Sequence, residues 1–218
     1  MKMIFVRRTL AACAAVSFIA CGATASIGAE AQDVMKTWDS IKADPPPPIK
    51  TVAIDTKTTA LISMDFNSKT CTAEKRKRCD AALPAVKKVL DEARAKKMMV
   101  VHTYIASMKE SDIVKSVAPK EGEPALVGSA NKFYGTDLEK QLKDKGIKTV
   151  ILMGTAANGA VLFSAFGAAE RHFKVIVPID TMPGDTAYAE QISIWEMANG
   201  PTVRNATTLT RSDMLSWK

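Results

Sequence analysis

A segment of small residues, 154–161 with the sequence GTAANGAV, has the composition of a bend between a strand and a helix. The apolar run from Thr149 to Met153 precedes it and is typical of a buried parallel strand. The small apolar residues from Val161 onward predict a helix after it. Such a bend directs backbone N–H groups into the space above a sheet, so we expect it to bind an anion or a developing oxyanion.

A carboxylate stands at the end of an earlier apolar run. Thr59 to Met64 predicts a second buried strand, and Asp65 follows at its carboxyl end. Ligands of open α/β sheets collect beyond the carboxyl ends of the strands, which makes Asp65 a candidate acid/base group. A solvated acid at a strand end or a helix cap is the alternative, and the residues alone leave both open.

A third segment, Lys132 to Thr136 with the sequence KFYGT, precedes a predicted helix. Thr136 and Glu139 have the spacing of a capping box, and Gly146 marks the expected end of that helix. Lys132 supplies a cation close to the start of this element. A surface lysine on a loop is the competing interpretation.

The order and spacing of these three segments resemble those of the isochorismatase-like hydrolase superfamily, many of whose members are cysteine amidases. The resemblance covers about residues 58–201 and implies that Asp65 is the acid/base group. The family's catalytic lysine is more often found several residues upstream, where this chain has Val127, so Lys132 is the nearest candidate. Ala160 occupies the position that usually carries the nucleophilic cysteine, and a methyl group cannot attack a carbonyl.

The resemblance also implies a substrate-binding set and a backbone feature. A cis peptide bond is expected at Thr155–Ala156, where it would direct backbone donors into the pocket. The backbone amides at Gly159 and Ala160 are expected to polarise the substrate. The residues assigned to substrate binding are Asn67, Phe133, Thr155, Ala156 and Gly159.

Two functions from different classes follow. In the first, the protein is a hydrolase of a small polar molecule in which Asp65 assists and water attacks. A general acid needs a raised pKa, whereas a nearby Lys132 would lower the pKa of Asp65, so either the lysine is displaced or Asp65 acts as a base. In the second, the protein is a catalytically silent relative that binds a small ligand or a partner protein.

No cofactor or metal is expected. The segment 154–161 lacks the Lys-Ser/Thr pair of a phosphate loop, and the chain has no dinucleotide fingerprint. Some relatives bind a metal through an Asp-x-His pair, but Phe66 and Asn67 follow Asp65 here. His102 lies within an apolar run, which predicts a hydrogen-bonded core histidine rather than a ligand.

The N-terminus predicts export. Residues 1–31 combine basic residues with an apolar stretch, 9–20, that is too short to span a bilayer, as in a cleaved signal peptide. Lipidation at Cys21 is the weaker alternative, because Phe18 stands where leucine is usual. The expected product is periplasmic or secreted and has no membrane attachment once the signal is removed.

Cleavage would leave Cys71 and Cys79 as the remaining cysteines, and in an oxidising compartment we expect a disulfide between them. The alternative is that Cys71 replaces the missing nucleophile.

The formal net charge of +7 falls to +5 without residues 1–31. The basic run 75–78 has no aromatic interleaving, which favours a solvated loop over a nucleic-acid site.

The rest of the chain predicts a Pro-rich arm, residues 32–57, and one domain, residues 58–218. Strands and helices alternate in that domain, which predicts a doubly wound α/β/α sandwich with a mainly parallel sheet of five or six strands. The family resemblance implies a homo-oligomer without fixing its size. The further elements expected are a helix starting at Pro84, a strand 98–105, an irregular insert 107–131, a helix 161–171, a strand 174–179, a helix 187–198 and a strand 206–209.

Overall fold

The computed structural model describes residues 33–218, so the expected signal segment, residues 1–31, lies outside the described part of the chain. The chain divides into two units between Asp44 and Pro45. The unit that ends at Asp44 contains a short helix, α1 (Val34–Thr37), capped by the carboxylate of Asp33. Between residues 33 and 218, none of the helices has the length and apolar character needed to cross a membrane.

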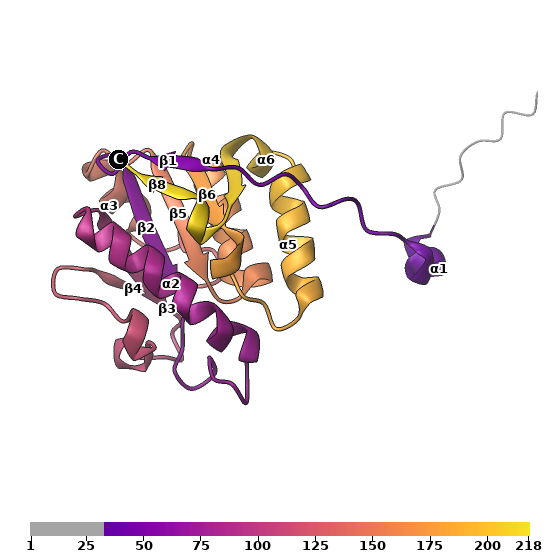
Figure 1. The fold of residues 1–218 in the computed structure, drawn as a ribbon, viewed down its shortest axis with the longest axis horizontal. Helices are drawn as coiled ribbons and strands as arrows, with labels where there is room; N and C mark the ends of the chain where they lie inside the picture. The colour runs from indigo at the N-terminus through magenta and orange to yellow at the C-terminus, as the bar shows by residue number, and fades with distance from the viewer. Residues whose placement is uncertain (1–32) are drawn as a thin grey trace, which may run out of the picture. The chain divides into compact units, whose positions relative to one another are not determined.

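The unit Pro45–Lys218 is built on a six-stranded sheet in which every pair of neighbours is parallel (Figure 1). The strand order is β4-β3-β2-β5-β6-β7, which confirms the predicted doubly wound α/β class. The strands are β2 (Thr59–Met64), β3 (Met99–Tyr104), β4 (Ala125–Val127), β5 (Thr149–Gly154), β6 (Lys174–Pro178) and β7 (Thr207–Thr210).

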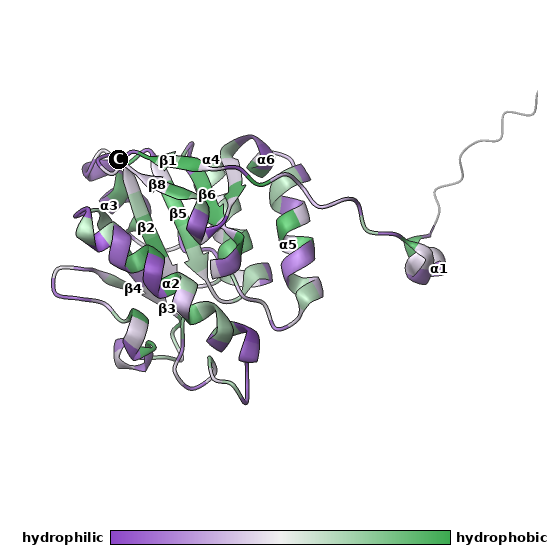
Figure 2. Ribbon diagram, in the orientation of Figure 1, coloured by the Kyte–Doolittle hydropathy of each residue, from purple (hydrophilic) through white to green (hydrophobic). Residues whose placement is uncertain are grey.

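Helices cover both faces of this sheet, so the apolar strands lie between two more polar layers (Figure 2). On one face, α2 (Lys77–Ala95) buries Val86, Leu90 and Ala93 against the strands. A two-stranded parallel sheet of β1 (Val52–Ile54) and β8 (Leu215–Trp217) adds to that core. The opposite face is covered by α3 (Leu138–Asp144), α4 (Leu162–Glu170), α5 (Ala187–Asn199) and α6 (Val203–Ala206).

The strand order reverses between β2 and β5, since β3 and β4 lie on one side and β6 and β7 on the other. Met64 and Gly154 are register partners at the carboxyl ends of these two strands. The backbones are so close that a Cβ added to Gly154 would lie 2.6 Å from the Cβ of Met64, so only glycine fits. Asp65 and the 154–161 bend therefore leave the sheet together at the position where such folds bind ligands.

The first long helix begins earlier than predicted. It starts at Lys77 rather than at Pro84, which lies inside α2 although it has no N–H to donate. Its first turn is held by the predicted disulfide between Cys71 and Cys79, which is present. Arg78 adds a salt bridge to Glu190 of α5, and these anchors compensate for the interruption at the proline.

Three short strands were absent from the prediction. The insert 107–131 contains β4, and the arm 32–57 contains β1, whose Ile54 is fully buried. Together with β8, these strands are three residues long, too short for a periodic pattern to reveal. The folded unit accordingly starts before residue 58.

A buried polar network fixes the insert to the sheet. Glu123 accepts two hydrogen bonds from Arg94 of α2, both at 2.8 Å, and contacts Nε2 of His102 at 2.9 Å. His102 is thus the hydrogen-bonded core histidine that the sequence predicts, and burial lowers its pKa. Burial alone would raise the pKa of Glu123, but the hydrogen bonds from Arg94, from the Lys120 amide and from His102 outweigh it and lower the pKa to about 2.

We expect Glu123→Gln to lower the free energy of unfolding at pH 7 by about 2 kcal/mol, because it removes the counter-charge of Arg94. The lowered pKa means that this contribution is complete above the ordinary value of 4.5 and is lost as the pH falls through about 2. The difference between variant and wild type should therefore shrink over that range in urea titrations followed by circular dichroism. Glu121→Gln, at an exposed neighbour, is the control, and equal losses in both variants would contradict this role.

Candidate active site

Asp65 and Lys132 form a nearly buried ion pair at the switch between β2 and β5. The Lys132 Nζ donates to Oδ2 of Asp65 at 2.7 Å, with the lysine side chain fully buried and the aspartate side chain 10% exposed. The other carboxylate oxygen, Oδ1, accepts a hydrogen bond from the hydroxyl of Thr103 at 3.0 Å. Asp65 has a φ of 60°, a left-handed conformation that is uncommon outside glycine and that recurs at functional sites.

Burial raises the pKa of Asp65 above its ordinary value, and this effect exceeds the opposing one of the Lys132 charge and of the hydrogen bonds from Lys132 and Thr103. The lysine is not displaced from the carboxylate. The expected conflict between an undisplaced lysine and a raised pKa is therefore absent, because the ion pair stabilises the ionised carboxylate, as a general base requires, while burial raises the pKa, as a general acid requires.

The loop that carries Lys132 is held along its backbone. The Lys132 amide donates to the hydroxyl of Ser164 in α4 at 3.1 Å, and its carbonyl accepts from the hydroxyl of Thr136 at 2.6 Å. Thr136 does not form the predicted capping box. Its hydroxyl accepts from the amide of Leu138, while Glu139 pairs with Lys143 and Arg171. The Thr136 hydroxyl therefore fixes the lysine loop, and the glutamate is taken by other cations.

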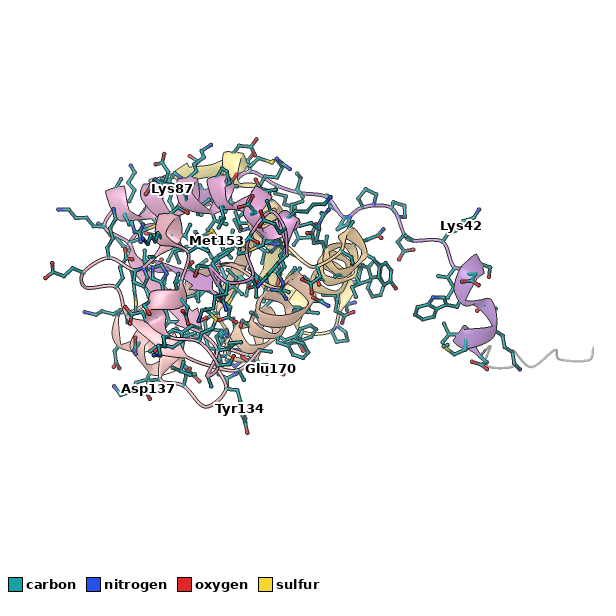
Figure 3. All side chains as sticks on the ribbon, turned by 90° about the horizontal axis from the view of Figure 1, so that it is seen from below. Lys42, Lys87, Tyr134, Asp137, Met153 and Glu170 are labelled. Atoms are coloured by element: carbon teal, nitrogen blue, oxygen red, sulfur yellow. A yellow bond between two sulfur atoms is a disulfide. The ribbon has the colours of Figure 1, made fainter. Side chains whose placement is uncertain are left out.

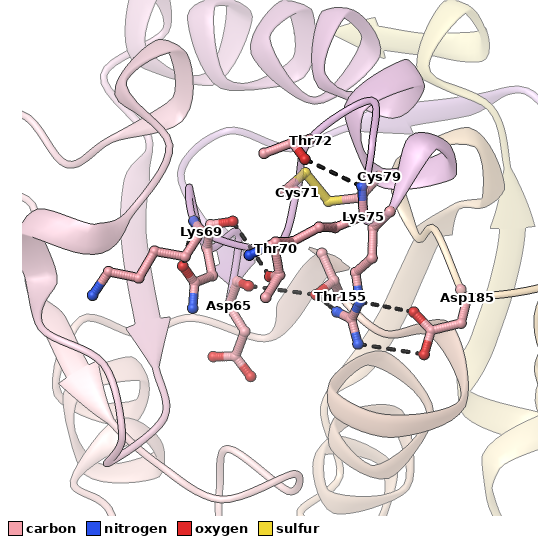
Figure 4. Close-up of a disulfide and its surroundings, with 12 residues drawn as sticks. Asp65, Lys69, Thr70, Cys71, Thr72, Lys75, Cys79, Thr155 and Asp185 are labelled. Atoms are coloured by element: carbon pink, nitrogen blue, oxygen red, sulfur yellow. Dashed lines mark hydrogen bonds and ion pairs between the residues drawn. A yellow bond between two sulfur atoms is a disulfide. The ribbon is translucent and has the colours of Figure 1, made fainter.

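The 154–161 bend lies directly beside Asp65. The Thr155 amide donates to the carbonyl of Met64 at 3.0 Å, and the Thr155 hydroxyl lies 3.4 Å from the carbonyl oxygen of Asp65 (Figure 4). The peptide bond between Thr155 and Ala156 is cis, at the position predicted. The structure thus brings together the three segments that the sequence singled out.

The bend differs from prediction in its backbone donors. Residues Ala157–Val161 form a helical turn with a kink at Gly159, and the Gly159 amide donates to the carbonyl of Ala156 at 2.9 Å. This N–H is already used, so the expectation that it polarises a substrate is not supported. Ala160 is 3% exposed and packs in the core. The disulfide between Cys71 and Cys79 also excludes the alternative that Cys71 supplies a free thiol.

Two predicted substrate contacts have structural roles here. The Asn67 side chain accepts a hydrogen bond from the amide of Lys69 at 2.8 Å, which stabilises a local turn. Phe133 is 3% exposed and packs against Phe173 with ring centroids 5.8 Å apart. Tyr134, in contrast, is 73% exposed and points away from the domain (Figure 3).

Three further residues contact the site and were not predicted from the sequence: Thr103, Ser164 and Arg76. Thr103 lies one residue before the end of β3, where a polar side chain next to the Asp65 strand was the available signal. The guanidinium of Arg76 reaches the Thr155 hydroxyl at 3.2 Å from a loop that the charge pattern suggested was merely solvated.

Across residues 33–218, no group of three or more His, Cys, Asp or Glu side chains is arranged to hold a metal ion.

Comparison with known proteins agrees with this geometry. The model of the isochorismatase domain matches residues 59–211. A secreted isochorismatase effector of Verticillium dahliae, Isc1, is 27% identical over 137 residues, which are 55% of this chain and 72% of that protein. The isochorismatase family protein YwoC of Bacillus subtilis is 26% identical over 161 residues, 62% of this chain and 82% of that protein.

Solved structures share the fold. The N-carbamoylsarcosine amidase of Thermoplasma acidophilum superposes with a TM-score of 0.63 at 23% identity, covering 72% of this chain and 97% of its own. A cysteine hydrolase of Pseudomonas syringae gives a TM-score of 0.64 at 18% identity, covering 77% of this chain and 94% of its own. Because the domain match spans residues 59–211 of 218, the chain belongs to the isochorismatase family.

Proposed function

We propose that this protein is an exported hydrolase that cleaves a small polar molecule with water, not a cysteine, as the attacking group. The observation that carries the proposal is the 2.7 Å contact between Asp65 and Lys132 beside the Thr155 bend. A buried carboxylate with a raised pKa, paired with a cation at the ligand-binding edge of the sheet, has the properties of an acid/base group.

The proposed reaction needs one proton carrier. The ionised carboxylate of Asp65 accepts a proton from water as the water oxygen bonds to the electrophilic carbon. The bond to the leaving group then breaks, and Asp65 returns the proton to that group. Lys132 lies against this carboxylate and stabilises negative charge that develops nearby.

A silent, ligand-binding relative is the alternative. It would be favoured if Phe133 or Tyr134 filled the space above the bend, but the first lies in the core and the second is exposed. Export is supported by the disulfide, which is typical of oxidising compartments, and by the secreted relative from Verticillium dahliae. We propose a periplasmic or secreted location on these grounds.

We expect Asp65→Asn to reduce turnover by about 10²-fold to 10⁴-fold, the usual contribution of a general acid or base. The assay is a panel of small amides, esters and enol ethers followed by product release. Asp137→Asn, at an exposed carboxylate next to α3, is the control and should keep wild-type rates. Full activity in the Asp65 variant would rule out the assigned role.

The rate should rise with pH as Asp65 ionises, and the midpoint of this rise should lie above the ordinary pKa of 3.8. Thr103→Val removes a hydrogen bond that lowers the pKa of Asp65, so the midpoint should move to higher pH in profiles of kcat/KM. Thr210→Val is the control, because this buried hydroxyl has no hydrogen-bond partner among the described residues. A rate that falls as Asp65 ionises would instead indicate a general acid.

Introducing a thiol at the bend tests whether the scaffold retains a hydrolase frame. We expect Ala160→Cys to gain turnover of amides or esters, and we expect Asp65→Asn to abolish that gain. Ala165→Cys, buried one turn further along in α4, is the matched control. No gain at Ala160, together with no native activity, would favour the silent alternative.

A further inference from the structure

The loop closed by the disulfide brings two arginines to the edge of the sheet. Arg78 pairs with Glu190 of α5, and the guanidinium of Arg76 pairs with Asp185 through Nε at 2.8 Å and Nη2 at 3.4 Å. Both acids belong to the segment that follows β6. The two arginines therefore connect the same two segments, but they differ in what else they touch.

Of these two arginines, Arg76 is the one that donates a hydrogen bond to the candidate site. Its Nη1 donates to the Thr155 hydroxyl at 3.2 Å, and that hydroxyl lies 3.4 Å from the carbonyl oxygen of Asp65. The guanidinium is thus two hydrogen bonds from the backbone of Asp65. Figure 4 shows Asp65, Thr155 and Asp185 around this loop.

Lys132 and Arg76 differ in how fully a counter-ion neutralises their charge. Lys132 is fully buried and neutralised by Asp65, so it leaves little positive charge for a ligand. The Arg76 side chain is 32% exposed, and its counter-ion Asp185 is 63% exposed. An ion pair so open to water is weak. Exchanging Asp185 for a ligand carboxylate at Arg76 therefore costs little free energy.

We propose that Arg76 binds a carboxylate of the substrate, so that the natural substrate is a small carboxylic acid whose cleaved bond lies next to Asp65. The planar fork of a guanidinium matches a carboxylate through two parallel hydrogen bonds. Asp185 occupies this fork when no ligand is bound. The inference rests on the proposed function for the cleavage step but not for the binding step.

Matched pairs of small molecules separate anion binding from general affinity. Succinamate and succinamide differ by one carboxylate, and benzoate and benzamide repeat the comparison in an aromatic frame. Their dissociation constants are measured by thermal-shift titration and by calorimetry on the full chain, with ammonia release checked in parallel. We expect wild type to prefer at least one anion over its amide by tenfold or more.

Arg76→Gln should remove that preference, whereas Arg78→Gln should retain it, because Arg78 clamps the same loop without touching Thr155. Asp185→Asn should strengthen anion binding several-fold, since it frees the guanidinium. If Arg76 and Asp185 only clamped the loop, this gain would be absent, because Arg76→Gln and Asp185→Asn would weaken the loop alike. Arg76→Lys keeps the charge without the fork and should restore the preference only in part.

Three results would overturn the inference: wild type that prefers neither anion, Arg76→Gln that keeps the preference, or Asp185→Asn that fails to bind the anion more tightly. The outcome is distinguishable from that of the proposed function. A protein that binds the anion through Arg76 but turns over nothing would contradict the hydrolase and leave this inference standing. An active protein that is indifferent to the carboxylate would do the reverse.

Discussion

The buried ion pair between Lys132 and Asp65 is the interaction on which the site depends. A lysine ammonium without exposure to water is tolerated only when an opposite charge and hydrogen bonds replace its hydration. The surrounding loop supplies the packing for this arrangement. Asn131, next to the lysine, lies so close to α4 that a Cβ at Gly167 would be 2.3 Å from its Oδ1. The glycine in the helix thereby permits the depth at which the lysine is held.

The sheet supplies the second constraint. Parallel strands place all their carboxyl ends on one edge, so Asp65 and Thr155 meet although they are 90 residues apart in the chain. The absence of a side chain at Gly154 lets the backbone of β5 approach Met64. The hydroxyl of Thr155 then lies against the aspartate, and a nucleophilic side chain is not required for this geometry.

Continuous apolar runs and the residues at their ends were predictable. The runs of β2 and β5 identify buried strands, and the polar residue after the first of them identifies the edge that carries Asp65. Contacts formed between distant segments were not. The lysine loop was identified as a segment, but its depth depends on Ser164, and the role of Arg76 depends on Thr155, 79 residues away.

Local patterns also competed with tertiary contacts. Thr136 and Glu139 have the sequence pattern of a capping box. In the structure, however, the Thr136 hydroxyl donates to the carbonyl of Lys132, and Glu139 pairs with Arg171. Pro84 is a strong helix-start signal, but α2 extends seven residues further back because the Cys71–Cys79 link and salt bridges hold its first turns. In each place one of the deciding partners, Arg171 or Glu190, is distant in the sequence and lies outside any local window.

The short span of the disulfide has a consequence for the order in which the site is assembled. Cys71 and Cys79 are eight residues apart, so they can meet before any of the sheet beyond β2 exists. Arg76, inside this closed ring, instead contacts Thr155 and Asp185, which lie 79 and 109 residues further along the chain. A locally closed ring thus depends on the last third of the polypeptide for the contacts of its arginine.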